Sequence, residues 1–282
     1  MMGTADQGPD AGLRPDEERV ITVAVAPVRA SPGHRAERVT DWVLGEVVRI
    51  LEVEGTWARA RGPDGYEGWT AAGPLGASAV DAAGWRAAAT LRSLGTAAAG
   101  LGRIPWGARV RPLDGGRIGL PDGGHAVPAE PERLLEVAEL SARRPREGAA
   151  VARSALEWLD VPYVWGGRTE LGVDCSGLVQ AVLAAHGAPL PRDSSAQREA
   201  RSGAELPLPT VEGSRPSALE PGDLLFFAPE GRGVTHVALS LGGWRIVHAA
   251  STNGRVAVDD LAADRPLSGR LAGSIVACAR PF

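Results

Sequence analysis

The sequence predicts an α+β fold in which two small β-barrels precede a larger domain of helices and a sheet. Between residues 19 and 130, short β-like runs are separated by Gly/Pro turns, a pattern typical of small barrels. From residue 143, helical spacing comes first and strand-like runs come later, which is typical of an α+β domain. The 282 residues suffice for two or three domains.

The first half is expected to hold a disordered leader at 1–18 and barrels at 19–80 and 81–142. Strands are predicted at 20–25 and 46–53. A hairpin is predicted from 57–61 and 66–70, around the turn Gly62-Pro63-Asp64-Gly65. A weak echo of residues 45–52 at 107–114 favours a second copy of the same unit, with chance similarity in a Gly/Pro/Arg-rich chain as the alternative.

The third domain is expected at 143–282. A helix is predicted over 146–159, and a Gly-rich loop at 166–172 follows it. The apolar stretch 175–186 comes next and ends at Gly187. Strands are then predicted at 223–228, 236–241, 245–249, 256–259 and 274–279.

Composition excludes several classes of protein. The net charge is −4, which excludes a broadly basic surface that coats nucleic acid. The chain has no lysine, so Schiff-base chemistry is excluded. It has no run of 18 apolar residues and no signal-peptide pattern at its N-terminus. We therefore expect a cytoplasmic protein with reduced thiols.

The two cysteines, Cys175 and Cys278, lie in different settings, and neither belongs to a CxxC, so no zinc cluster is expected. Cys175 follows the Gly-rich loop at the predicted start of a helix, where free N–H groups and the helix dipole favour a low-pKa thiolate and can hold an oxyanion. Position alone leaves two interpretations open, a nucleophile or a small buried core residue. Cys278 lies in an apolar terminal strand and is expected to be inert.

A thiolate nucleophile needs a base, and the chain has five histidines. His186 would lie about 16 Å from Cys175 along the same helix, at 1.5 Å per residue. His236 and His248 flank the turn at 242–244 at nearly equal distances, and the register of that hairpin decides whether they share a face. If they do, one imidazole can take the thiol proton while the other fixes its tautomer. The alternative is a pair of structural histidines.

The motifs along residues 145–282 resemble those of the NlpC/P60 cysteine peptidases. They are YVWGG at 163–167 with DCSGLV at 174–179, PRDSSAQ at 191–197, PGDLLFF at 221–227, THVA at 235–238 and IVHA at 246–249. The resemblance implies a papain-like core with Cys175 as nucleophile, His236 as base and His248 as orienting residue. It implies neither a cofactor nor a metal.

The upstream units resemble bacterial SH3 domains, and the three-part layout is similar to the γ-D-glutamyl-L-diamino-acid endopeptidases of cell-wall recycling. This implies hydrolysis of the γ-D-Glu–diamino-acid bond in murein tri- and tetrapeptides, with neither nucleic acid nor membrane as partner. The alternatives are a wall-degrading hydrolase, an amidase or acyltransferase of the same superfamily, and a non-catalytic wall-binding protein. In the permuted acyltransferases His precedes Cys, whereas here Cys comes first.

Further site residues follow from the resemblance. Tyr163 is expected to donate to the oxyanion, with a loop aromatic as the alternative, and Ser194 is a possible substrate contact. Arg192 is expected to pair with Asp193, at the start of a helix that Asp193 or a following serine caps.

A pocket for the free amino group of L-Ala is also expected. Asp174 beside the nucleophile would oppose thiolate formation unless a cation offsets its charge, and the substrate ammonium is such a cation. Ser176 would add a hydrogen bond. The resemblance places Glu46 and Tyr66 of the first barrel near the cleft, where they are expected to complete the pocket. The alternatives are a solvated strand-end charge for Glu46 and an aromatic of the barrel core for Tyr66.

Overall fold

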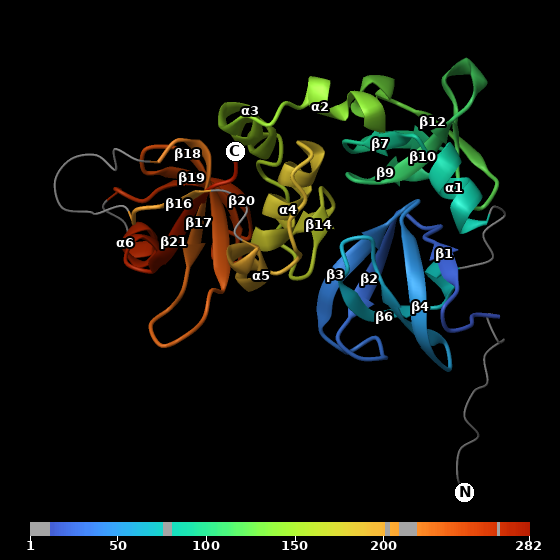
Figure 1. Cartoon of the computed structure of the whole chain (residues 1–282), viewed down its shortest axis with the longest axis horizontal. Coiled ribbons are helices and arrows are strands. Elements are labelled where there is room, and N and C mark those ends of the chain that lie inside the picture. The colour runs from blue at the N-terminus through green and yellow to red at the C-terminus, as the bar shows by residue number, and fades with distance from the viewer. Residues whose placement is uncertain (1–11, 76–80, 201–203, 209–218, 264–265) are drawn as a thin grey trace, which may run out of the picture. The chain divides into compact units, whose positions relative to one another are not determined.

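The computed structural model describes residues 12–75, 81–200, 204–208, 219–263 and 266–282 and divides into two compact units, 1–137 and 138–282 (Figure 1). The first unit contains two small β-barrels, and the second packs helices on a six-stranded sheet, so the predicted fold class is confirmed. Residues 1–11 of the expected leader lie outside the described part of the chain. Within that part, no helix combines the length and apolar character that crossing a membrane requires.

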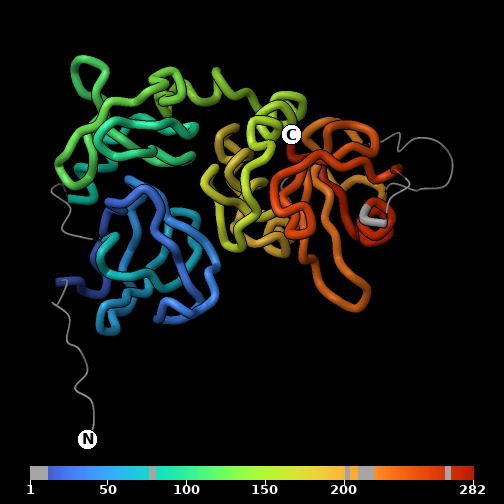
Figure 2. The backbone as a smooth tube through the Cα atoms, turned by 180° about the vertical axis from the view of Figure 1, so that it is seen from behind, coloured from blue at the N-terminus to red at the C-terminus, as the bar shows by residue number. Residues whose placement is uncertain are grey.

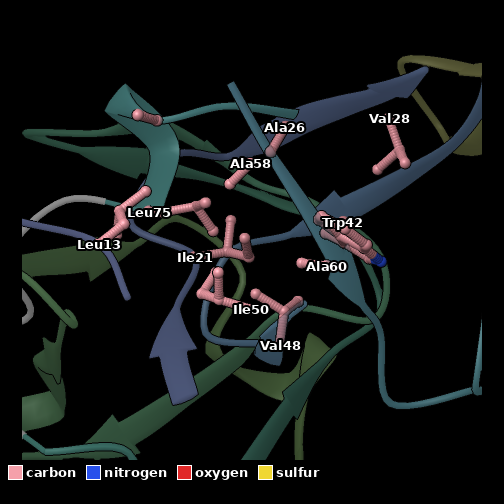
Figure 3. Packing of buried hydrophobic residues seen from close by; sticks show 11 residues of the cluster. Leu13, Ile21, Ala26, Val28, Trp42, Val48, Ile50, Ala58, Ala60 and Leu75 are labelled. Carbon is pink, nitrogen blue, oxygen red and sulfur yellow. The ribbon is translucent and has the colours of Figure 1, made fainter. Parts of the chain in front are cut away.

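Six strands of the first barrel surround one apolar core. In β4 (Val47–Glu54), Val48 and Ile50 are buried whereas Arg49 is exposed, as the two-residue period of a strand requires. Figure 3 shows Val48 and Ile50 next to Ile21 in this core. The other elements are β1 (Glu18–Val20), β2 (Val25–Arg29), β3 (Arg38–Val43), β5 (Trp57–Arg61), β6 (Glu67–Ala71) and η1 (Gly73–Leu75).

The hairpin predicted around residues 62–65 is confirmed, because β5 and β6 are antiparallel neighbours joined there. The strand predicted at 20–25 is instead two strands, since β1 ends at Val20 and β2 begins at Val25. Between them, the N–H of Ile21 donates to Glu46 O at 2.9 Å as the chain crosses the barrel. Ordered structure also begins before residue 19, because Leu13 packs into the barrel core.

The second barrel is a seven-stranded sheet joined to the first through its core. Leu44 of the first barrel belongs to the apolar cluster of the second, and its carbonyl accepts from Arg109 N at 2.9 Å. The indole Nε1 of Trp85 donates to Gly45 O at 2.9 Å. The two barrels therefore form one unit. Its elements are α1 (Ala82–Ala88), β7 (Leu91–Ser93), β8 (Thr96–Ala99), β9 (Gly102–Ile104), β10 (Arg109–Pro112), η2 (Asp114–Gly116), β11 (Ile118–Gly119), β12 (His125–Pro128), η3 (Pro131–Arg133) and β13 (Leu134–Glu136).

The second unit contains a sheet of strand order β16-β21-β17-β18-β19-β20, and the backbone trace of Figure 2 shows it from behind. Helix α4 is buried on nearly every side, as its apolar sequence requires, and contacts β18 and β19. The elements are η4 (Val137–Glu139), α2 (Leu140–Arg143), α3 (Gly148–Leu156), β14 (Arg168–Thr169), β15 (Gly172–Val173), α4 (Cys175–Ala185), α5 (Ser194–Glu199), β16 (Ala204–Leu206), β17 (Pro221–Phe227), β18 (His236–Gly242), β19 (Arg245–Ala250), β20 (Arg255–Asp260), α6 (Pro266–Ala272) and β21 (Ile275–Arg280).

Two glycines let α3 approach the start of β17 closely. A Cβ on Gly148 would overlap the carbonyl oxygen of Pro221, and a Cβ on Gly222 would overlap the backbone of Gly148. Gly222 also has a φ of +90°, which disfavours any side chain there. Helix α3 is therefore held directly against the central strand of the sheet.

Candidate active site

Cys175 is the first residue of α4 and lies beside the start of β18. Asp174 caps the helix, because its Oδ1 accepts from Gly177 N at 2.7 Å. The backbone N–H groups of Ser176 and Val237 donate to the Cys175 sulfur, and Val237 directly follows His236 in the chain. The sulfur thus faces N–H groups from two elements, one of them in the residue that follows His236, and an oxyanion needs such donors.

A β-bulge puts His236 and His248 on the same face of the sheet. The β18–β19 ladder pairs Gly242 with Arg245, then shifts by one residue and pairs Leu239 with Val247. Without the bulge, continuation of the ladder would turn the two histidines to opposite faces. With it they are diagonal neighbours, and His236 Nε2 lies 2.8 Å from His248 Nδ1.

Two residues that the sequence did not single out extend this pair. His248 Nε2 lies 2.8 Å from Asp259 Oδ2, and Asn253 Nδ2 donates to the same oxygen at 2.9 Å. Asp259 lies on β20, two residues from Ala257, the partner of His248. The sequence shows only a carboxylate at the end of a predicted strand, and its pairing with His248 depends on the register of that strand.

Burial keeps both reacting groups neutral at rest. It raises the pKa of the Cys175 thiol to about 11, an effect that Asp174 reinforces. Burial, together with the neighbouring His248, lowers the pKa of His236 to about 3. The low-pKa thiol expected from the sequence is therefore absent in the resting site, because a dry environment disfavours the thiolate more than nearby N–H groups and Arg192 favour it.

Arg192 supplies the cation that offsets Asp174. Its Nη1 and Nη2 donate to the two carboxylate oxygens at 3.0 and 2.7 Å, and both side chains are buried. Nη1 also donates to Ser176 Oγ at 2.9 Å. Asp174 needs such a partner because a buried carboxylate is unstable without one. The expected pairing of Arg192 with Asp193 stays a prediction.

Asp174 also holds the Gly-rich loop in place. Gly166 N donates to its Oδ2 at 2.9 Å, and Asp174 N donates to Gly167 O at 3.1 Å. With Arg192 and Gly177, this fills the acceptor positions of the carboxylate. The charge of Asp174 therefore needs no substrate ammonium, and its contact with the substrate stays a prediction.

Tyr163 lies near the nucleophile on this loop. Burial, together with the charges of Cys175 and Asp174, raises the pKa of its hydroxyl to about 12. The phenol therefore keeps its proton over the working pH range. This suits the predicted role as a donor to the oxyanion.

The other candidate residues lie in several places. Ser194 begins α5 and is half-buried. Ser176 is buried and follows the nucleophile. In the first barrel, Glu46 Oε2 accepts from Val43 N at 2.9 Å, and Tyr66 directly precedes β6. The substrate contacts predicted for all four stay predictions.

The remaining thiol and the helix histidine have structural roles. Cys278 belongs to the apolar cluster of the sheet, where burial raises its pKa to about 12. His186 caps the end of α4, with Nε2 2.8 Å from Ser154 Oγ and Nδ1 2.6 Å from Pro145 O. Both observations agree with the sequence-based expectations for these residues.

Comparison with known families accounts for this geometry. Residues 160–267 match the model of the NlpC/P60 family, and this segment includes the Gly-rich loop, Cys175, His236 and His248. The second unit is an NlpC/P60 domain. Residues 28–73 of the first barrel match the bacterial dipeptidyl-peptidase SH3 domain. Both resemblances drawn from the sequence are thus confirmed.

Curated relatives share mainly the NlpC/P60 domain. The gamma-D-glutamyl-L-lysine dipeptidyl-peptidase of Bacillus subtilis (strain 168) is 33% identical over 125 residues, 43% of this chain and 39% of the relative. The dipeptidyl-peptidase 6 of Lysinibacillus sphaericus is 36% identical over 117 residues, 42% of this chain and 38% of the relative. The peptidoglycan endopeptidase RipB of Mycobacterium tuberculosis (strain ATCC 25618 / H37Rv) is 31% identical over 157 residues, 51% of this chain and 60% of the relative. The chain therefore matches less than two thirds of the length of each of these relatives.

Solved structures show that the fold extends beyond the NlpC/P60 domain. An NlpC/P60 family protein from Bacillus cereus ATCC 10987 superposes with a TM-score of 0.74 at 18% identity, covering 93% of this chain and 99% of the other. An NlpC/P60 endopeptidase from Photobacterium damselae subsp. piscicida gives 0.62 at 14% identity, covering 93% and 70%. At these identities the similarity concerns the fold alone.

Proposed function

We propose that this chain is a cysteine peptidase that hydrolyses the γ-D-Glu–diamino-acid bond of murein stem peptides with a free N-terminal L-Ala. One observation carries the proposal: the Cys175 sulfur lies at a helix N-terminus and accepts from the backbone N–H of Val237, the residue after His236, whose ring is hydrogen-bonded to that of His248. A nucleophile, a base with an orienting partner and oxyanion donors are what acyl transfer requires.

The mechanism starts from a neutral Cys175 thiol and a neutral His236 imidazole. As the Cys175 sulfur attacks the peptide carbonyl, its proton passes to His236. The backbone N–H groups near the sulfur, such as that of Val237, hold the oxyanion. The C–N bond then breaks, and the leaving amine takes the proton from His236. Water, deprotonated by the same imidazole, hydrolyses the thioester and restores the thiol.

The bond specificity in this proposal is supported by the relatives. Two of them are named dipeptidyl-peptidases, one of these for a γ-D-glutamyl-L-lysine bond, and the first barrel matches the SH3 domain named for that class. A dipeptidyl-peptidase acts next to a free amino end. We therefore propose L-Ala-γ-D-Glu-diamino-acid peptides as the substrates, within the broader class of peptidoglycan peptides.

A second candidate is an endopeptidase that acts on intact wall. The 31% identity to RipB, which aligns over 51% of this chain, favours it. The two candidates differ in one requirement, because a wall-degrading enzyme accepts a stem peptide whose L-Ala nitrogen is acylated.

The test is digestion of L-Ala-γ-D-Glu-diaminopimelate, free or N-acetylated, with mass-spectrometric detection of L-Ala-γ-D-Glu. We expect cleavage of the free peptide by wild type and by Cys278→Ala, and none by Cys175→Ala. The acetylated peptide should react at least about tenfold more slowly, since a charge-assisted hydrogen bond contributes roughly 1.5–3 kcal/mol. Equal turnover of both peptides supports the wall-degrading candidate, and full activity in Cys175→Ala excludes both.

We also propose that the reaction takes place in the cytoplasm. Recycling of wall peptides in the cytoplasm, expected from the sequence, is tested by fractionating cells that produce the protein and probing each fraction with an antibody. Recovery in the cytoplasmic fraction supports recycling, and recovery outside the cell contradicts it.

A further inference from the structure

We propose that Asp259 is a positioning residue of the active site, which determines through His248 which ring nitrogen of His236 carries the proton. Asn253 holds Asp259 in the orientation that this requires. The effect on catalysis rests on the proposed function, whereas the arrangement of protons does not.

The four side chains form one row across three strands and a turn. His236 lies on β18, His248 on β19 and Asp259 on β20, and each is a diagonal neighbour of the next. Diagonal partners in a sheet are about 7–8 Å apart at the backbone, within reach of imidazole and carboxylate groups. The row ends at Asn253, in the turn between β19 and β20.

The Asp259 carboxylate determines which atom donates in each hydrogen bond of the row. An ionised Asp259 can only accept, so His248 Nε2 must carry the proton in the 2.8 Å bond between them. In a neutral ring this leaves His248 Nδ1 as an acceptor. The 2.8 Å bond from His236 Nε2 to His248 Nδ1 then requires the proton on His236 Nε2.

The remaining nitrogen of His236, Nδ1, is left with a lone pair. It is the nitrogen available to Cys175, because Nε2 is occupied by His248. The carboxylate at the far end thus makes His236 a base toward the thiol. With the opposite polarity, Nδ1 would carry a proton and could not accept one.

Asn253 supports this assignment independently. Its Nδ2 donates to the oxygen of Asp259 that faces His248, which is possible only if that oxygen is an acceptor. Its backbone N donates to Ala250 O at 3.1 Å, and the next residue, Gly254, accepts from Tyr163 N at 2.8 Å. It is also the only asparagine in the chain.

Burial makes the carboxylate effective. The side chain of His248 is 0% exposed and that of Asp259 is 16% exposed, so little water competes for their bond. A negative charge there also stabilises the positive charge that arrives on His236 when it takes the thiol proton. Around the nucleophile, electrostatic interactions join Cys175 and Asp174 at the start of α4 with Tyr163 before the Gly-rich loop and Arg192 before α5.

The first test needs no substrate. Nitrogen-15 NMR of the histidines in wild type at pH 7.5 should show His236 and His248 both protonated on Nε2 and unprotonated on Nδ1. Asp259→Asn should give a mixture of tautomers in both rings. A wild-type ring protonated on Nδ1, or an unchanged pattern in the variant, would overturn the proposal without bearing on the peptidase activity.

The second test measures turnover and uses a matched control. Asp259→Asn should lower kcat about ten- to over a hundredfold with little change in KM, as expected for loss of one charge-assisted hydrogen bond. The acid limb of its pH profile should move to lower pH, because removing a negative charge destabilises the protonated histidines. Asp260→Asn removes the same charge from the next residue, which is exposed and caps the N–H of Ala262, and should change kcat less than twofold.

The role of Asn253 is tested by a double-mutant cycle. Asn253→Ala should lower kcat severalfold in wild type but have no further effect in Asp259→Asn, because it acts through that carboxylate. Additive losses would contradict this coupling. A fall of kcat in Asp259→Asn with wild-type tautomers and an unshifted acid limb would show a merely structural role and overturn the proposal.

Discussion

Two thiols of similar burial differ in what lies beside them. Cys278 is surrounded by the apolar cluster of the sheet, whereas Cys175 receives backbone N–H groups, one of them from the residue after His236. Burial raises the pKa of both, so neither is a thiolate at neutral pH. Reactivity at Cys175 therefore depends on proton transfer to His236 during attack and not on a standing negative charge.

Alkylation of Cys175 should therefore depend steeply on pH. In the Cys278→Ala background, the rate with iodoacetamide should rise about tenfold per pH unit from pH 6 to 9, because the thiolate fraction grows in this way below a pKa of about 11. Mass spectrometry of the labelled peptide gives the rate. A rate that is constant between pH 6 and 8 would instead show a preformed thiolate–imidazolium pair.

At the scale of single elements, a bulge, a helix cap and a close backbone contact position the site. The bulge in β18 brings His236 and His248 to one face, and the cap by Asp174 orients the start of α4. The contact of Gly148 with Gly222 sets the distance between α3 and β17. Such features position the functional groups without taking part in the chemistry.

Gly148→Ala should destabilise the NlpC/P60 domain by roughly 1–3 kcal/mol or more, because the new Cβ overlaps the carbonyl oxygen of Pro221. Chemical denaturation gives the free energy of unfolding, and hydrogen exchange of the α3 amides gives the local effect. Gly269→Ala in α6 is the matched control, since its Cβ would meet no atom within 4 Å. This control should be neutral or stabilising by up to about 1 kcal/mol. Equal stability of both variants would contradict the packing argument.

At the scale of the whole molecule, two histidines of the NlpC/P60 domain couple its stability to pH. Burial lowers the pKa of His236 to about 3 and lowers that of His186 as well. The unfolded chain, with an ordinary histidine pKa near 6.5, binds protons that the folded chain does not. Stability therefore rises with pH in the range where these groups are protonated only when unfolded.

The free energy of unfolding of this domain should thus fall as the pH drops below about 6.5, by up to about 1.4 kcal/mol per pH unit for each histidine. Hydrogen exchange of the α4 amides between pH 5 and 8, corrected for the intrinsic rate, measures it. His186→Gln should reduce the slope below pH 6.5 and leave stability independent of pH near pH 8. An unchanged slope in the variant would show that His186 does not contribute.

Local chemistry made much of the fold predictable from the sequence. The turn at 62–65 carries its own Gly and Pro signals, and the alternation of β4 shows which residues face the core. The start of α4 at Cys175 follows from the Asp174 cap and the apolar run after it. The motifs around Cys175, His236 and His248 likewise identified the family, because each is short and continuous in the chain.

The sequence by itself thus determined the fold class and the NlpC/P60 and SH3 resemblances, and it predicted the three residues that we propose at the centre of the site. Only the tertiary structure showed two pairings of charged residues that are distant in the chain: Arg192 with Asp174, and Asp259 with His248. The physical reason is that a partner is chosen by burial and by cross-strand register, and a one-residue bulge changes that register for every residue beyond it. Neither burial nor cross-strand register can be read from the spacing of residues along the chain.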